Sequence, residues 1–207
     1  MSAHVSGFNL DPDSGVERRR RDDVYPENVP RHLQYPDIAA WELLDRAALS
    51  MPGRLACHYN ESRWTWEELQ IDACRAAKML RRAGVRPGDR VGILLPNCPE
   101  YVIALNGIWR LGGIAVLLSP KEVAGEIERQ RRATDCRVVI CLDMLAGLLT
   151  GGFRPDLTMF VSLRPQLPLF EQLGYLYQRK RRTGNWWWPA ENEIHWFWET
   201  PGELAGY

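Results

Sequence analysis

Short apolar runs alternate with helix-like segments through most of the chain, and this alternation is the feature that most restricts its fold. The run RVGILL at residues 90–95 is continuous and apolar, as expected of a strand buried on both faces of a parallel sheet. A helical segment over 99–111 and the run GGIAVLL at 112–118 follow it, which makes one β-α-β unit. The same order repeats downstream, with helices predicted at 123–133 and 145–149 and strands at 137–142 and 158–162. The sequence therefore predicts an α/β fold with a partial doubly wound, mostly parallel sheet.

Helix boundaries are marked by capping signals on both sides of the first apolar run. Thr65 with Glu68 three residues later forms a capping box that predicts a helix start, and Gly84 is a stop signal for the same helix. Asn97 with Glu100 has the same spacing, which predicts a second capping box at the start of the helix between the two strands. Both helices therefore have defined beginnings in the sequence.

Three regions follow from the distribution of these patterns. Residues 1–34 are polar and charged and are expected to form a disordered arm. Residues 35–163 contain all the regular periodicity, beginning with an amphipathic helix over 37–49 and a short strand over 55–59. Residues 164–207 hold five of the nine tryptophans. This last region shows little periodicity, and we expect an irregular Trp-rich tail.

Charge and cysteine content exclude several functional classes. Lys and Arg together number 26, equal to Asp and Glu, so the net charge gives no reason to expect a nucleic-acid partner. An odd number of cysteines without a C-x-x-C pair favours reduced thiols in a cytosolic protein, and the spacing argues against a zinc site. The five cysteines are Cys57, Cys74, Cys98, Cys136 and Cys141.

Membrane-spanning and secretory segments are not expected. The N-terminal region has four arginines at 18–21 followed at once by two aspartates, which does not fit a signal peptide. The most apolar stretch, 101–118, is interrupted by Asn106 and Arg110, and an arginine in mid-span costs roughly 2.5–3.5 kcal/mol on insertion scales. We therefore expect a cytoplasmic protein.

The order of several short motifs resembles one enzyme family. WEEL at 66–69, GVRPGDRV at 84–91, PNCPE at 96–100 and the glycine pair at 112–113 leading to Pro120 occur in this order and spacing. Together they resemble the N-terminal subdomain of the AMP-binding, adenylate-forming acyl-CoA synthetases, in particular of the long-chain fatty-acid CoA ligases. The resemblance covers about residues 35–142 and extends weakly into the tail. The tetrapeptide SPKE at 119–122 departs from the Asn-Pro-Leu-Tyr that is frequent in the family.

The resemblance implies ATP, Mg²⁺ and CoA as cofactors of the complete family enzyme. Such an enzyme joins a carboxylate to AMP and then transfers the acyl group to the CoA thiol. It needs a glycine-rich phosphate loop, a magnesium-binding carboxylate and a lysine near the developing charge. The glycine pairs at 112–113 and 151–152 lack the hydroxyls and lysine of that loop, and the family's other catalytic motifs do not occur in these 207 residues. We therefore assign no catalytic, cofactor-binding or metal-binding residue, and expect the chain alone to be inactive and to bind these cofactors poorly. A separate polypeptide would then carry the rest of the ligase.

The tail suggests contact with a membrane surface. It combines an apolar segment, LPLFEQLGYLYQ, with cations and aromatic side chains that favour a peripheral interface with anionic lipid. The residues expected to make this contact are Arg179, Lys180, Arg181, Arg182, Trp186, Trp187 and Trp188. We favour instead that the tryptophans pack against another subdomain of the whole enzyme. A non-catalytic interaction or membrane-docking module derived from such an enzyme is the alternative function, whereas RNA stacking on these aromatics is disfavoured because no RNA-binding motif occurs.

Reactive side chains elsewhere have simpler interpretations. Cys98 precedes a predicted helix, whose dipole can lower a thiol pKa, but we favour a small apolar residue in the turn between strand and helix. His32, His58 and His195 have no metal-ligating partners at suitable spacing, so we expect structural or surface roles for them.

Overall fold

The computed structural model describes residue 26 and residues 35–149, 152–184 and 194–196, the last three as backbone. By its contacts the chain divides into two units, Met1–Asp37 and Ile38–Tyr207. The second unit contains the helices and strands described below.

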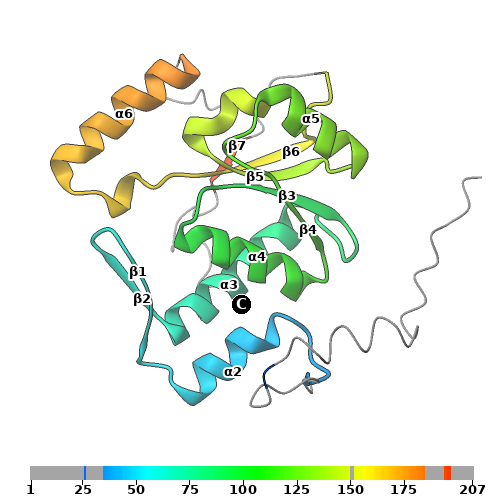
Figure 1. The fold of residues 1–207 in the computed structure, drawn as a ribbon, viewed down its shortest axis with the longest axis vertical. Coiled ribbons are helices and arrows are strands. Elements are labelled where there is room, and N and C mark those ends of the chain that lie inside the picture. The colour runs from blue at the N-terminus through cyan, green and yellow to red at the C-terminus, as the bar shows by residue number, and fades with distance from the viewer. Residues whose placement is uncertain (1–25, 27–34, 150–151, 185–193, 197–207) are drawn as a thin grey trace, which may run out of the picture. The chain divides into compact units, whose positions relative to one another are not determined.

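A five-stranded sheet of parallel strands forms the centre of this unit (Figure 1). The strand order is β4-β3-β5-β6-β7, and each neighbouring pair runs parallel. The doubly wound α/β fold predicted from the sequence is therefore confirmed. The strands are β3 (Arg90–Leu94), β4 (Ile114–Leu117), β5 (Val138–Leu142), β6 (Leu157–Val161) and β7 (Ile194–Trp196).

Helices cover both faces of the sheet because the connections run in opposite directions. Helix α4 (Pro99–Leu111) connects β3 to β4, and α5 (Ala124–Ala133) returns across β3 to reach β5. Right-handed crossovers in opposite directions place these two helices on opposite faces. Helices α2 (Glu42–Ser50) and α3 (Trp66–Arg82) pack on the side of α4, and the 3₁₀ helix η1 (Asp143–Leu149) contacts α5 on the other side (Figure 1).

A hairpin leads into α3 and ends in the predicted capping box. Strands β1 (Leu55–Tyr59) and β2 (Ser62–Thr65) pair antiparallel. The Thr65 hydroxyl accepts a hydrogen bond from the Glu68 amide, and the Glu68 carboxylate accepts one from the Thr65 amide. This reciprocal pair confirms the helix start predicted from the sequence.

The apolar stretch at 101–118 becomes helix α4 and strand β4, the two elements predicted for it from the sequence. Asn106 donates to the Val102 carbonyl one turn earlier at 2.9 Å, which satisfies a buried amide within the helix. The Arg110 guanidinium pairs with Asp45 on α2 and lies 4.8 Å from the Trp41 ring centroid. No helix in the described part of the chain is long and apolar enough to cross a bilayer.

The structure corrects the prediction of an irregular tail after residue 163. A 3₁₀ turn, η2 (Arg164–Gln166), is followed by the fifteen-residue helix α6 (Leu169–Thr183), which packs on η1. The periodicity was hidden because the buried row of α6 contains Tyr175 and Arg179 instead of aliphatic residues. Gly184, with a positive φ of 80°, ends the helix.

Candidate functional site

The carboxyl ends of the parallel strands form the edge where α/β proteins usually bind ligands. In the sheet, β4 lies on one side of β3 and β5 lies on the other. The chain therefore changes direction across the sheet between β3 and β5. Ligands of such sheets bind outside the carboxyl ends at this reversal. Here residues 95–100 follow β3, Asp143 follows β5, and residues 162–166 follow β6. These three segments define the candidate site.

Glu100 and Gln166 form a buried pair at this edge. Their residues are 3% and 8% exposed, and the Gln166 amide Nε2 donates to Glu100 Oε1. Glu100 Oε2 and Gln166 Oε1 are buried without a hydrogen-bond partner. Burial raises the pKa of the Glu100 carboxyl above its ordinary value. The pair joins the start of α4 to the turn after β6.

The structure contradicts the second predicted capping box. Cys98, not Asn97, is the N-cap residue of α4, and no side chain caps this end. Pro99 occupies the first turn and has no amide to cap, while Glu100 turns inward to Gln166. A local spacing therefore resembled a cap although the glutamate serves a long-range contact.

Cys98 is a buried structural residue with an unreactive thiol. Its exposed fraction is 7%, and burial, with the adjacent Glu100 carboxylate, raises the pKa of the thiol to about 12. Desolvation thus outweighs the helix dipole that could have lowered this pKa. The structural interpretation favoured from the sequence agrees with this environment.

Asp143 is the centre of a second buried polar cluster, one strand away. Its carboxylate is fully buried and accepts hydrogen bonds from the Tyr175 hydroxyl, from Arg179 Nη1 at 3.3 Å and from the Met144 amide at 2.8 Å. The Leu163 amide donates to the Tyr175 hydroxyl at 3.3 Å. Burial raises the pKa of Tyr175, so the phenol stays protonated at neutral pH. The cluster fastens α6 to the carboxyl ends of β5 and β6.

Arg179 is therefore not a surface cation, in contrast to the prediction from the sequence. It is 7% exposed and forms an ion pair with Asp143, because it occupies the row of α6 that faces the sheet. Lys180 is half-buried, and Arg181 and Arg182 are exposed at the end of the helix. The predicted contact residues Trp186, Trp187 and Trp188 lie outside the described residues.

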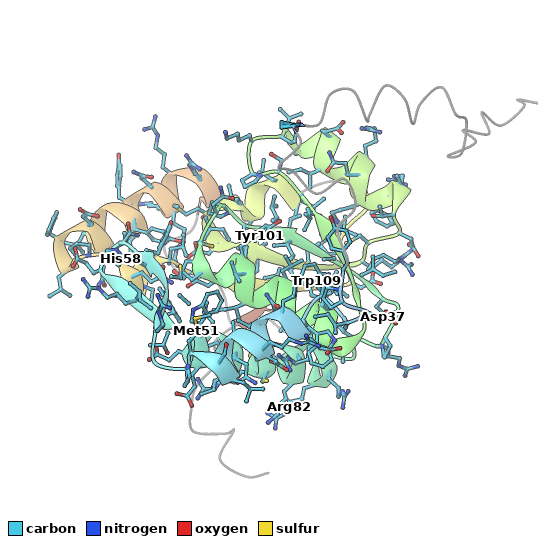
Figure 2. All side chains as sticks on the ribbon, turned by 60° about the horizontal axis from the view of Figure 1, so that its bottom comes forward. Asp37, Met51, His58, Arg82, Tyr101 and Trp109 are labelled. Carbon is cyan, nitrogen blue, oxygen red and sulfur yellow. The ribbon has the colours of Figure 1, made fainter. Side chains whose placement is uncertain are left out.

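The histidines do not join either cluster. His58 is exposed on the hairpin of β1 and β2 (Figure 2). His32 and the side chain of His195 lie outside the described residues. Within the described ranges, no group of three or more His, Cys, Asp or Glu side chains is arranged to hold a metal ion.

A cavity of about 390 Å³ lies away from the carboxyl edge, between η1, the start of β6 and the end of α6. Arg154 and Arg182 contribute cationic side chains to its lining, and Leu149, Pro155 and Phe160 contribute apolar surface. It shares no residue with the Glu100 and Asp143 clusters. The candidate site at the carboxyl edge is a packed junction of buried polar side chains, and this cavity is separate from it.

Sequence reasoning missed Asp143 and Tyr175 as partners. One signal was present, since Asp143 directly follows an apolar strand and therefore stands at the carboxyl edge of the sheet. Tyr175 and Arg179 are four residues apart, the spacing of one helix face. Asp143 lies far from α6 in the sequence, so no local pattern could show that it contacts Tyr175 and Arg179.

The strand order of the sheet and the helices on both of its faces place the chain in the class of doubly wound α/β proteins. The family model of the AMP-binding enzymes matches residues 44–172, which is more than half of the chain. The chain therefore belongs to the AMP-binding enzyme family, as the order of its motifs predicted.

Similar proteins agree with this assignment. A long-chain-fatty-acid–CoA ligase of Bacillus subtilis (strain 168) is 34% identical over 162 residues, which are 77% of this chain and 29% of that protein. The 4-coumarate–CoA ligase 1 of Solanum tuberosum is 33% identical over 132 residues, 64% of this chain and 23% of that one. The chain thus spans less than a third of these curated relatives.

Solved structures show the same fold. The apo structure of MbtA from Mycobacterium smegmatis superposes with a TM-score of 0.56 and 28% identity, over 61% of this chain and 25% of that one. A long-chain-fatty-acid-CoA ligase, FadD1, from Archaeoglobus fulgidus gives a TM-score of 0.58 at 22% identity, over 62% of this chain and 28% of that one.

Proposed function

We propose that this chain forms the N-terminal subdomain of an ATP-dependent acyl-CoA ligase that activates a fatty acid in the cytoplasm. The observation that supports it most directly is the 34% identity to a long-chain-fatty-acid–CoA ligase across 77% of the chain. The family match covers β3 to β6 and the helices between them, so the shared part is four of the five strands of the sheet and not a short motif.

ATP, Mg²⁺ and CoA are the cofactors that this proposal implies for the complete enzyme. The buried groups at the carboxyl edge of this sheet do not fit an ATP phosphate, because the oxygen atoms of Glu100, Asp143 and Gln166 are acceptors and cannot donate to phosphate oxygens. We therefore place nucleotide chemistry in the remainder of such an enzyme. The role proposed for this chain is to support that remainder as a scaffold.

Fatty-acid-dependent exchange of pyrophosphate into ATP tests the proposal. The 207-residue chain is assayed alone and mixed with a polypeptide that supplies the phosphate loop and everything after it from the Bacillus ligase. The expected result is no exchange by either part and exchange by the mixture. Exchange by the chain alone would place the chemistry here, and an inactive mixture of two parts that do associate would contradict the scaffold role.

Substrate choice is tested in the same mixture. The relatives include both fatty-acid and 4-coumarate ligases, so palmitate and 4-coumarate are compared at equal concentration. A higher rate with palmitate supports fatty-acid activation. Preference for 4-coumarate would retain the acyl-CoA ligase but reject the fatty-acid substrate.

A second candidate function is a non-catalytic interaction module at a membrane surface. The observation in its favour is that α6 exposes large apolar side chains next to Arg181 and Arg182. Trp186, Trp187 and Trp188 remain part of this proposal on the strength of the sequence alone. The candidate predicts binding without nucleotide turnover, whereas the ligase predicts turnover once the remainder is supplied.

A further inference from the structure

Helix α6 has an apolar stripe on the side opposite its buried row. Leu169, Leu173 and Tyr177 are four residues apart and form one row along the helix, and Phe170 lies beside it. Their exposed fractions are 84%, 71%, 60% and, for Phe170, 75%. Four large apolar side chains on one helix face, this far exposed, mark an interaction surface.

The stripe continues into positive charge. Lys180 and Arg181 follow Tyr177 by three and four residues, so they extend the same row into the last turn of α6. Glu171 is the one acidic residue of the helix, and its spacing of two from both Leu169 and Leu173 sets it on a different side. Apolar and cationic side chains therefore share one face, which is free of acidic residues.

The orientation of this face is fixed by the buried side of the helix. The Tyr175 hydroxyl and Arg179 bind the carboxylate of Asp143, at the carboxyl end of β5. Because these contacts hold one row against the sheet, the opposite row must point outward. The surface is thus presented by a rigid support.

We propose that this face of α6 docks on an anionic membrane surface. The helix would lie in the plane of the bilayer, with its apolar side chains at the boundary of headgroups and acyl chains and with Lys180 and Arg181 at lipid phosphates. An apolar row alone would suit a protein partner equally well. Two cations continue that row. An anionic bilayer has an apolar interior and negatively charged headgroups, so it matches both parts of the surface, and we therefore propose lipid as the partner. This docking rests on and specifies the membrane-surface candidate proposed above, and it is independent of the proposed ligase chemistry.

Vesicle flotation of the 207-residue chain tests the charged part of the surface. Vesicles of phosphatidylcholine with about 30% phosphatidylglycerol are compared with pure phosphatidylcholine, at low and high salt. We expect binding to the anionic vesicles that weakens with salt. The double variant Lys180→Gln/Arg181→Gln should bind at least about fivefold more weakly, since an exposed cation such as Arg181 contributes about fivefold near such a surface and Lys180 is half-buried. The matched control is Arg81→Gln/Arg82→Gln, which removes the same charge from the last turn of α3 (Figure 2).

A second pair of variants tests the apolar part. Phe170→Ser/Leu173→Ser should reduce binding at least about tenfold. The control is Leu43→Ser/Leu49→Ser on α2. These two leucines are 60% and 83% exposed, and their replacement should leave vesicle binding unchanged. Circular dichroism verifies that each variant is folded. No binding to anionic vesicles, or equal losses in variant and control, would overturn the proposal. The proposal would also be overturned if the chain did not bind vesicles but formed a dimer that Phe170→Ser/Leu173→Ser dissociates. A second copy of the chain would then cover the stripe.

Discussion

The side-chain amide of Gln166 donates to the carboxyl group of Glu100, joining two turns that are 66 residues apart in sequence. Each side chain keeps one buried oxygen without a donor. A proton on the Glu100 carboxyl would supply the missing donor, and the raised pKa of this group favours that protonated form. The pair is therefore suited to a neutral acid, not to a carboxylate.

Glu100→Gln should stabilise the protein as the pH rises. Because the folded pKa lies above the ordinary value of 4.5, the folded state binds a proton that the unfolded chain has released, so stability falls with increasing pH through this interval. A glutamine supplies the donor permanently. We expect a gain of about 1–2 kcal/mol in the free energy of unfolding at pH 7 and a flatter pH dependence, measured by urea unfolding from pH 4 to 8. Glu61→Gln, on the exposed hairpin turn, is the control and should change neither quantity. A wild-type pH dependence in Glu100→Gln would contradict the prediction.

Two arginines of α6, two residues apart, should differ sharply in their effect on stability. Arg179 is 7% exposed and pairs with the fully buried Asp143, whereas Arg181 is exposed. Arg179→Met leaves a buried carboxylate without its cation, and we expect a loss of about 3–5 kcal/mol. Arg181→Met should stay within about 0.5 kcal/mol of wild type. Urea unfolding of both variants measures the contrast, and similar losses would show that Asp143 does not depend on Arg179.

Strands β3, β4, β5 and β6 were predictable because each is a short apolar run between helical segments, whereas β7 lies in the region that was expected to be irregular. Val91, Ile93 and Leu94 are fully buried on β3, and Val139, Ile140 and Cys141 are fully buried on β5, so nearly every position of these strands reports burial directly. The capping box of α3 was predictable for a similar reason, since both partners lie within three residues. Local patterns of this kind specify elements and their order.

The polar junction at the carboxyl edge could not be derived in this way. The partner of Glu100 lies 66 residues downstream, and Arg179 lies 36 residues after Asp143. No periodicity connects residues so far apart, and the short spacing from Asn97 to Glu100 suggested a cap instead. In α6 the buried row is polar, so the rule that inward residues are apolar failed at Tyr175 and Arg179. Such exceptions occur where distant segments meet through paired polar groups.

Replacing Arg131 with an apolar residue should stabilise the protein. It is 1% exposed on the inner side of α5, its Nε and Nη2 have no hydrogen-bond partner, and its Cζ lies 5.3 Å from the Phe153 ring centroid. Burial lowers the pKa of this guanidinium, in agreement with its two unpartnered nitrogen atoms. Arg131→Met should raise the free energy of unfolding by about 1–3 kcal/mol, as replacement of uncompensated buried charge does.

A neighbouring arginine provides the control for Arg131. Arg132 lies 5.2 Å from the same ring centroid but is exposed and pairs with Glu128. Arg132→Met should therefore lower stability slightly, by about 0.5 kcal/mol. Thermal unfolding of the two variants gives the sign of each effect. A destabilised Arg131→Met protein would mean that the cation–π contact outweighs the burial of the charge.

Two helical glycines should respond in opposite directions to the same substitution. A Cβ at Gly107 on α4 would lie 2.7 Å from the Cβ of Ala76 and 3.2 Å from the backbone nitrogen of Ala77, both on α3, while a Cβ at Gly174 on α6 would meet nothing within 4 Å. Alanine is favoured over glycine within a helix by about 1 kcal/mol, so Gly174→Ala should stabilise by up to that amount. Gly107→Ala gains the same propensity but must separate two helices, and we expect a net loss of about 1–3 kcal/mol. Urea unfolding distinguishes the two, and a stabilised Gly107→Ala protein would show that α3 and α4 can move apart at little cost.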